Sequence, residues 1–208
     1  MIIAIDGPTA SGKGTIAKAL AAHYGLPHLD TGLLYRAVGR QVLLNGGNPD
    51  DPADALAAAD FPEGLLGDDE LRSEDTGALA SRVSIHPAVR AALLARQQAF
   101  ARQPGGAVLD GRDIATVIAP EAEAKLFVTA SVAARAQRRW AEMQKRGETM
   151  TREDIEADLA ARDERDRSRA AAPLRQAEGA ALLDTSALPI DAAIAAAIAL
   201  VEQQVTAR

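Results

Sequence analysis

A loop of small residues with one lysine near its end follows the first apolar run of the chain, and its sequence over residues 7–15 is GPTASGKGT. Small residues leave backbone N–H groups free to converge on an anion, and Gly7, Gly12 and Gly14 can adopt dihedral angles that a Cβ forbids. The spacing satisfies G-x-x-x-x-G-K between a strand pattern and a helical pattern, and the start of a helix favours bound anions. From this position Lys13 can reach the β and γ phosphates of a nucleotide. The loop therefore predicts a nucleotide phosphate site.

The residue after the lysine departs from the usual form of this loop. Ser or Thr normally stands there as a metal ligand, whereas here Gly14 takes that place and Thr15 follows one position later. We therefore assign no direct protein ligand to a metal ion. Asp110, at the end of a later strand pattern, could instead organise the water shell of Mg²⁺.

A second candidate segment is LDTGLLYR, residues 29–36, at the start of the next helical pattern. It presents Asp30, Thr31 and Tyr35, and Arg36 lies one helical turn after Gly32, so its guanidinium could fold back toward an anion. An ordinary N-cap followed by a solvated arginine is the alternative interpretation.

A third segment, VLDGRD at residues 108–113, ends a strand pattern with a glycine between charged residues. Arg112 could donate to a phosphate, and Asp113 could accept from the edge of a base. A charged turn after a core strand would explain the same residues, and the phosphate loop favours the functional interpretation because ligands collect at this edge of an α/β sheet.

The segment ARDERDRSR, residues 161–169, alternates arginines with acidic residues. Such a run is usually a solvated helix or loop. In phosphoryl transfer, however, arginines on a closing segment neutralise the transferred group in a site without water. The four arginines of this run are Arg162, Arg165, Arg167 and Arg169, and its acidic residues are Asp163, Glu164 and Asp166.

The composition excludes several classes of protein. A net charge of −6 over 208 residues argues against a broad nucleic-acid-binding surface, although residues 131–147 concentrate positive charge that suits a small anionic ligand. The absence of cysteine excludes disulfides and thiolate metal sites, and the three histidines are too scattered to indicate a metal cluster. No window is apolar for long enough to span a membrane, and no signal segment opens the chain. We expect a cytoplasmic protein without a membrane or nucleic-acid partner.

Strand and helix patterns alternate along the whole chain. Strand patterns lie at residues 2–6, 107–110, 125–130 and 181–186, with a short one at 27–30. Helical patterns lie at residues 15–25, 32–47, 87–100, 131–147 and 189–205, and Thr151 with Asp154 could cap a further helix through the arginine-rich run. Residues 48–86 show weak periodicity and are interpreted as an irregular or mobile insert. The alternation predicts one α/β domain, residues 1–208, with a parallel sheet flanked by helices and ligands at the carboxyl ends of its strands.

Taken together, GPTASGKGT, LDTGLLYR, VRAALLARQQAF, GRDIATVIAP and ARDERDRSRAAAPL resemble the successive motifs of the bacterial cytidylate kinase family, in the family's order. The ending of the phosphate loop is shared by many nucleoside monophosphate kinases, and GRD with RDERDRSR narrows the match. The resemblance implies a P-loop NTPase-type fold with an acceptor-binding insert at about residues 32–104 and a short lid at about residues 148–172. It also implies a monomer that transfers the ATP γ-phosphoryl group to CMP or dCMP with Mg²⁺.

The resemblance implies roles for named residues. Those expected to wrap the ATP phosphates are Gly7, Pro8, Thr9, Ala10, Ser11, Gly12, Lys13, Gly14 and Thr15. Those expected to bind CMP are Thr31, Tyr35, Arg36, Ser81, Arg90, Arg112, Asp113, Arg162, Asp166 and Arg169, with Ser81, Arg90 and Asp113 reading the cytosine edge. Those expected to act in catalysis are Lys13, Arg112, Arg162 and Arg169.

The insert departs from the family's pattern, because relatives can carry a small extra sheet there and residues 48–70 have little strand character. Two other functions remain open from the residues alone. One is a P-loop kinase for UMP, AMP or a hydroxyl acceptor. The other is a nucleotide-dependent switch. The sequence argues against a switch because it contains no N-K-x-D element for reading guanine.

Overall fold

The fold is built on one sheet of five parallel strands. The computed structural model describes residues 1–145, 147 and 149–206, so Arg146 of the basic segment and residue 148 of the predicted lid lie outside the described residues. The strands are β1 (Ile2–Asp6), β2 (His28–Asp30), β3 (Ala107–Gly111), β4 (Ala124–Thr129) and β5 (Ala181–Asp184). Their order in the sheet is β2-β3-β1-β4-β5, and every neighbouring pair is parallel. The predicted α/β architecture is confirmed.

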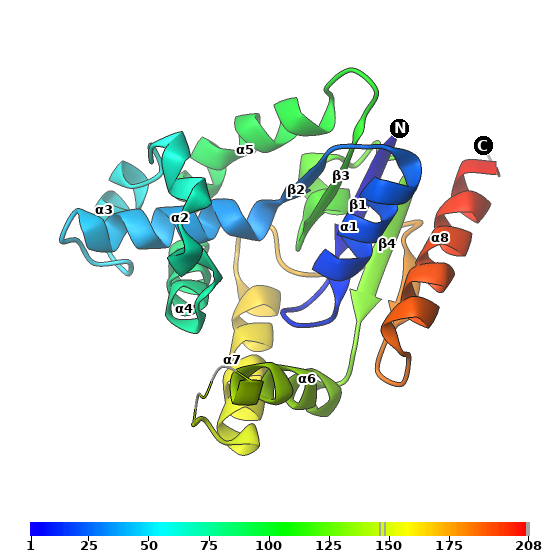
Figure 1. Ribbon diagram of the computed structural model, residues 1–208. Coiled ribbons are helices and arrows are strands. Elements are labelled where there is room, and N and C mark those ends of the chain that lie inside the picture. Colours follow the sequence, from blue (N-terminus) through cyan, green and yellow to red (C-terminus); the bar gives the residue numbers. More distant parts are fainter. Residues whose placement is uncertain (146, 148, 207–208) are drawn as a thin grey trace.

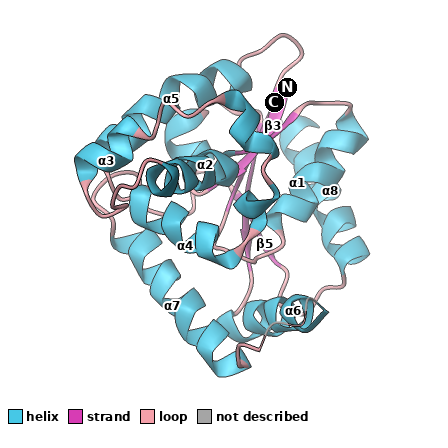
Figure 2. Ribbon diagram, turned by 60° about the vertical axis from the view of Figure 1, so that its left-hand side comes forward, coloured by secondary structure: helices cyan, strands magenta, loops and turns pink. Residues whose placement is uncertain are grey.

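Alternation along the strands divides the core into two layers. Ile3 and Ile5 of β1 face a cluster that also holds α1 and α8, whereas Ala4 between them faces the opposite side with Leu109 and Ile118. Period-two alternation requires this division, because successive side chains of a strand point to opposite faces. Figure 2 shows helices surrounding the strands. Both faces of the sheet are therefore covered, as is usual for a parallel sheet.

Eight α-helices and three shorter helical turns surround or extend this sheet in the part of the chain that the structure describes. The α-helices are α1 (Lys13–Tyr24), α2 (Thr31–Leu44), α3 (Pro52–Ala57), α4 (Glu74–Val83), α5 (Pro87–Ala101), α6 (Val132–Lys145), α7 (Arg152–Ser168) and α8 (Ile190–Thr206). The shorter turns are η1 (Glu63–Gly67), η2 (Asp69–Arg72) and the π-helical turn η3 (Ile114–Ile118). No helix among these described residues is both long and apolar enough to cross a membrane.

The expectation of an irregular segment at residues 48–86 is wrong. Asp51 caps α3, whose first residue is Pro52, and Ser73 caps α4 through the backbone N–H of Thr76 at 3.2 Å. These helices are too short to give a clear period in the sequence. Together with α2 and α5 they bury their own apolar cluster, away from the sheet at the left of Figure 1.

Helices α6 and α7 form a second outlying unit, below the sheet in Figure 1. A small cluster joins them, in which Ala136 and Met143 of α6 pack with Ile155 and Leu159 of α7. Ala10, in the loop after β1, packs against the same cluster. The capping of α7 by Thr151 is confirmed, since its hydroxyl accepts from the backbone N–H of Asp154 at 3.1 Å.

Candidate functional site

A cavity of about 750 Å³ lies at the carboxyl ends of the strands, between the sheet, the α2/α4 unit and the α6/α7 unit. Its walls come from the loop after β1, the start of α2, the turn after β3, α6, α7 and the segment after β5. In a parallel sheet all carboxyl ends meet at one edge, so segments far apart in the sequence converge here. Cationic side chains outnumber carboxylates along the described walls, as an anionic ligand requires.

The loop between β1 and α1 has the form that the sequence predicts, with one correction. A Cβ on Gly7 would lie 2.0 Å from the carbonyl oxygen of Val128, and Gly12 has φ of +89°. Ala10 also adopts a positive φ, of 60°, although it carries a Cβ. The expectation for Gly14 is wrong, because it lies in the first turn of α1 without a positive φ. The loop thus depends on glycine at positions 7 and 12, through close approach and left-handed geometry.

Lys13 extends back along this loop. Its Nζ donates to the carbonyl oxygen of Pro8 at 3.1 Å. Burial, with a smaller contribution from the neighbouring Arg112, lowers the pKa of Lys13 to about 8, although Asp110 and Asp30 act in the opposite direction. A nearby phosphate would restore the ammonium form by adding negative charge.

Asp110 presents a buried carboxylate beside the phosphate loop. It is 3% exposed, and its Oδ1 lies 2.7 Å from Nε2 of His28 on β2. Its Oδ2 lies 3.8 Å from the position that a Cβ on Gly14 would take. One oxygen is therefore held by His28 while the other faces the loop. A carboxylate oxygen is the ligand type that Mg²⁺ prefers, directly or through water, so this residue fits the metal ion that accompanies a nucleotide.

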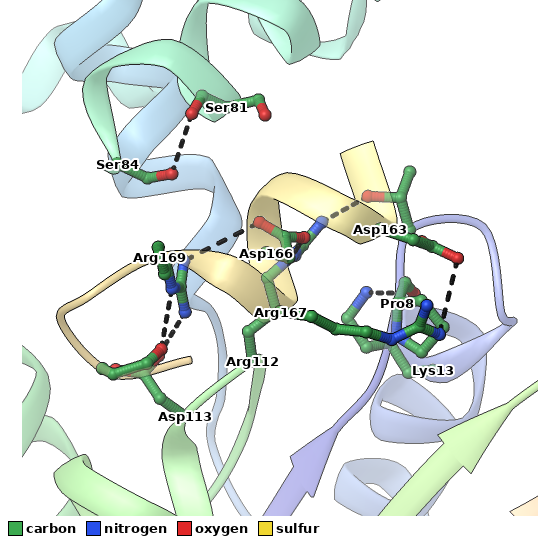
Figure 3. A network of polar contacts seen from close by, with 12 residues as sticks. Pro8, Lys13, Ser81, Ser84, Arg112, Asp113, Asp163, Asp166, Arg167 and Arg169 are labelled. Atoms are coloured by element: carbon green, nitrogen blue, oxygen red, sulfur yellow. Dashed lines mark hydrogen bonds and ion pairs between the residues drawn. The ribbon is translucent and has the colours of Figure 1, made fainter. Parts of the chain in front are cut away.

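Arg112, in the turn after β3, forms hydrogen bonds with both the phosphate loop and α7. The Arg112 guanidinium donates to the hydroxyl of Thr9 and to the carboxylate of Asp166. Figure 3 shows Arg112 and Arg169 both directed at Asp166. Burial opposes the charge on Arg112, but the ion pair with Asp166 outweighs it and raises the pKa of the guanidinium. Burial likewise acts against the ionised form of Asp166, and Arg112 reverses this and lowers the pKa of its carboxyl.

A second polar group lies around Asp113. Its carboxylate accepts from Arg90 and lies 4.0 Å from Nη2 of Arg169. The Arg90 guanidinium also lies over the ring of Tyr35, 5.4 Å from its centroid. The hydroxyl of Ser81, on α4, is buried at this end of the cavity, and no hydrogen-bond partner for it lies among the described residues. This arrangement offers fixed donors and acceptors to a planar polar ligand.

A third group gathers arginines from α2, α6 and α7. Nη1 of Arg36 donates to the carbonyl oxygens of Leu71 and Ser73, each at 2.8 Å, and Nη2 lies 2.9 Å from the position that a Cβ on Gly77 would take. Arg162 and Arg139 both pair with Glu74. Burial together with the neighbouring Arg162 and Arg36 lowers the pKa of Arg139 to about 10. Asp158 also pairs with Arg162, at 2.9 Å, so carboxylates of α4 and α7 balance part of the positive charge, and an anionic ligand would balance more of it.

The structure brings nearly all of the predicted site residues to this one cavity. Thr9 to Thr15 and all ten residues expected to bind CMP line it. Gly7 and Pro8 do not line it, and they shape the loop from behind. Which ligand each residue binds stays a prediction.

Sequence reasoning missed several residues of the cavity wall. Among them are Glu74, Arg138, Arg139, Thr185, Leu188, Pro189 and Ile190. Thr185 directly follows β5, so the rule that strand carboxyl ends collect ligands could have found it. Arg138 donates to its hydroxyl at 3.0 Å. The positive charge over residues 131–147 indicated an anionic ligand, but nothing in the pattern distinguished Arg138 and Arg139 from the other basic residues of that segment.

Comparison with known proteins agrees with this geometry. The family model described as cytidylate kinase matches residues 3–203. A cytidylate kinase of Xanthobacter autotrophicus is 60% identical over 97% of this chain and 97% of its own, and one of Rhodopseudomonas palustris is 55% identical over 97% and 96%. An uncharacterised protein from Eubacterium ventriosum has a similar fold, with a TM-score of 0.56 and 14% identity over 100% of this chain and 99% of that chain. The chain belongs to the cytidylate kinase family.

Proposed function

We propose that the protein transfers the γ-phosphoryl group of ATP to CMP or dCMP in this cavity, giving ADP and CDP or dCDP. The observation that carries the proposal is the convergence, on one cavity, of a phosphate loop and a buried polar group around Asp113 and Arg90. Membership of the cytidylate kinase family supports the reaction and its substrates.

ATP would bind with its phosphates on the loop from Gly7 to Thr15. The positive end of α1 and Lys13 would hold the β and γ phosphates. Beyond the loop, the cavity is lined by Arg138, Leu188 and Pro189, which suit the stacked face of a nucleobase. The adenine would therefore lie between α6 and the segment after β5.

CMP would bind on the other side of the phosphate loop. Asp113 would accept from the cytosine amino group, with Arg90 and Ser81 donating to its ring and carbonyl acceptors. Arg36, Arg112 and Arg169 would hold the acceptor phosphate, while Tyr35 and Thr31 complete the wall. Arg162 and Asp166 would contact the transferring phosphate and the sugar. Helices α2 to α5 would then be the acceptor-binding insert, and the segment around α7 the lid.

No general base is required for this transfer. The attacking oxygen of the acceptor phosphate is already anionic at neutral pH, so catalysis consists of positioning and charge neutralisation. Lys13, Arg112, Arg162 and Arg169 supply fixed positive charge around the transferred group. Mg²⁺ bound with ATP would neutralise charge on the β and γ phosphates, and the carboxylate of Asp110 would hold its water shell.

The same geometry would help to exclude water from the transfer. Arg112 contacts α7 through Asp166, and Arg169 contacts both Asp166 and Asp113, so the lid segment and the acceptor site share a polar network (Figure 3). A lid held in this way would protect ATP from hydrolysis. We further propose that the enzyme acts as a monomer in the cytoplasm.

Product analysis tests this proposal. The protein is incubated with MgATP and CMP, and ³¹P NMR follows CDP, ADP and inorganic phosphate. We expect CDP and ADP in equal amounts with little phosphate. The variant Lys13→Met should lower turnover by about a hundredfold or more, since it removes a cation from the phosphates, whereas the exposed Lys145→Met on α6 should not change it. Full activity of Lys13→Met, or phosphate release without CDP, would contradict the proposal.

A further inference from the structure

Asp6 is a buried carboxylate outside the cavity wall. It is the last residue of β1 and is 1% exposed. Its Oδ1 accepts from the backbone N–H of Ile114 at 2.7 Å, and its Oδ2 accepts from that of Ala115 at 2.9 Å. The next residue, Gly7, donates its N–H to the carbonyl oxygen of Gly111 at 3.2 Å. The end of β1 is thus bonded to the end of β3 before a short turn and to η3 after that turn.

The turn enclosed by these bonds consists of Arg112 and Asp113. Its two side chains leave in different directions, Arg112 toward Thr9 and Asp166, and Asp113 toward Arg90. Figure 3 shows both residues directed into the site from the end of β3. The backbone behind them is held by the Asp6 carboxylate, so the position of both side chains depends on that carboxylate.

Burial makes the ionised form of the Asp6 side chain energetically unfavourable. Desolvation, with a smaller contribution from Asp113, raises the pKa of Asp6 to about 7. The two backbone N–H groups and Lys13 act in the opposite direction and lower this pKa. A carboxylate is also the one short side chain that presents two acceptors side by side. Asparagine has the same shape but would direct an NH₂ group at one of the two N–H donors. The geometry therefore selects Asp at this position.

We propose that Asp6 is a positioning residue that fixes the Arg112–Asp113 turn against the phosphate loop and so aligns acceptor and donor. The inference deepens the proposed function, on which its kinetic test rests. Asp6 touches neither substrate and acts through the backbone of residues 114 and 115.

The kinetic test compares Asp6→Asn with the wild type. Losing one charge-assisted hydrogen bond and leaving its donor unpaired should raise the KM for CMP by about tenfold to a hundredfold. The Kd for ATP, measured by calorimetry, should change by less than about threefold, because the phosphate loop keeps its own contacts. Equal changes for CMP and ATP, or no change for CMP, would overturn the inference.

A matched control separates positioning from stability. Val108→Ala removes a fully buried side chain from β3, on the sheet face opposite Ile114 and Ala115. It should lower the Tm without changing the KM for CMP, because a cavity in the core destabilises the fold but leaves the turn bonded. A raised KM for CMP in this control would assign the effect to stability and overturn the inference.

Amide hydrogen exchange provides a test that needs neither activity nor a folded variant. In the wild-type protein without nucleotide, the amides of Ile114 and Ala115 should exchange as slowly as those of β3, since both are bonded to Asp6. Where Asp6→Asn folds, these two amides should exchange at least about tenfold faster while β3 stays protected. Fast exchange in the wild type would overturn the inference, whatever reaction the enzyme catalyses.

Discussion

Lys13 combines two properties that are usually separate, a place in a phosphate loop and a pKa lowered by burial to about 8. In the free protein it loses its proton as the pH rises through 8. Bound phosphate would raise this pKa again, because negative charge favours the ammonium form. Binding of ATP near and above pH 8 should therefore take up a proton at Lys13.

This uptake can be measured by calorimetry. At pH 8.5, the heat of ATP binding should differ between two buffers of unlike ionisation enthalpy by an amount equivalent to a sizeable fraction of a proton. At pH 6.5, where Lys13 is already charged, the uptake at this residue should be near zero. The variant Lys13→Met should lose the uptake at pH 8.5, and undiminished uptake in that variant would contradict the assignment.

Ser81 allows the contribution of one neutral hydrogen bond to CMP binding to be measured. Its hydroxyl is buried, and no partner for it lies within the described part of the chain. If it pairs with cytosine, Ser81→Ala should raise the KM for CMP by about threefold to tenfold, as for the loss of one neutral hydrogen bond. Ser168→Ala, which removes an exposed hydroxyl at the end of α7, is the matched control and should have no effect. An unchanged KM in Ser81→Ala would remove this residue from the base site.

At the scale of elements, α6 and α7 are joined by a buried ion pair. Nη1 and Nη2 of Arg135 donate to the two carboxylate oxygens of Asp163, at 3.0 and 2.5 Å. Arg135 also donates to the carbonyl oxygen of Thr9 at 3.1 Å, so the same side chain ties these helices to the phosphate loop. A buried pair of this kind destabilises the fold strongly when only one partner is removed.

Two variants test this arrangement. Asp163→Asn should lower the free energy of unfolding by about 3–5 kcal/mol, because Arg135 keeps a buried charge without its partner. The double variant Arg135→Met with Asp163→Leu should regain most of the loss, since well-packed apolar residues often replace a buried pair at little cost. Denaturant unfolding measures both. A double variant no more stable than Asp163→Asn would contradict the role given to the isolated charge.

Sequence reasoning located most elements because their signals are local. A strand of alternating or continuous apolar residues, a capping threonine before α7 and a glycine-rich loop before α1 are each visible over a few residues. The helices between residues 52 and 83 were not visible, because they are short and are stabilised by packing on α2 and α5. Their stability comes from contacts between distant segments, which periodicity does not report.

For the whole molecule, the sheet topology explains why the site could be predicted in part. The phosphate loop and the turn at Arg112 and Asp113 follow strands, and parallel strands bring such segments to one edge. Arg138 and Arg139 lie within α6, which follows β4, and only the placement of α6 over the cavity gives them a ligand-facing position. The Asp6 contact was equally invisible, because its partners are backbone groups of residues 114 and 115.

The central claim is that this cavity couples a phosphate donor to a cytidine monophosphate. The most direct measurement is a coupled assay of ADP release with MgATP and CMP, dCMP, UMP, AMP or GMP at matched concentrations. We expect kcat/KM values for CMP and dCMP that exceed those of the other three by at least about tenfold, the effect of one mismatched hydrogen bond at the base site. Equal or higher values with UMP, AMP or GMP would contradict the roles of Ser81, Arg90 and Asp113, and no turnover with any monophosphate would contradict the phosphoryl transfer itself.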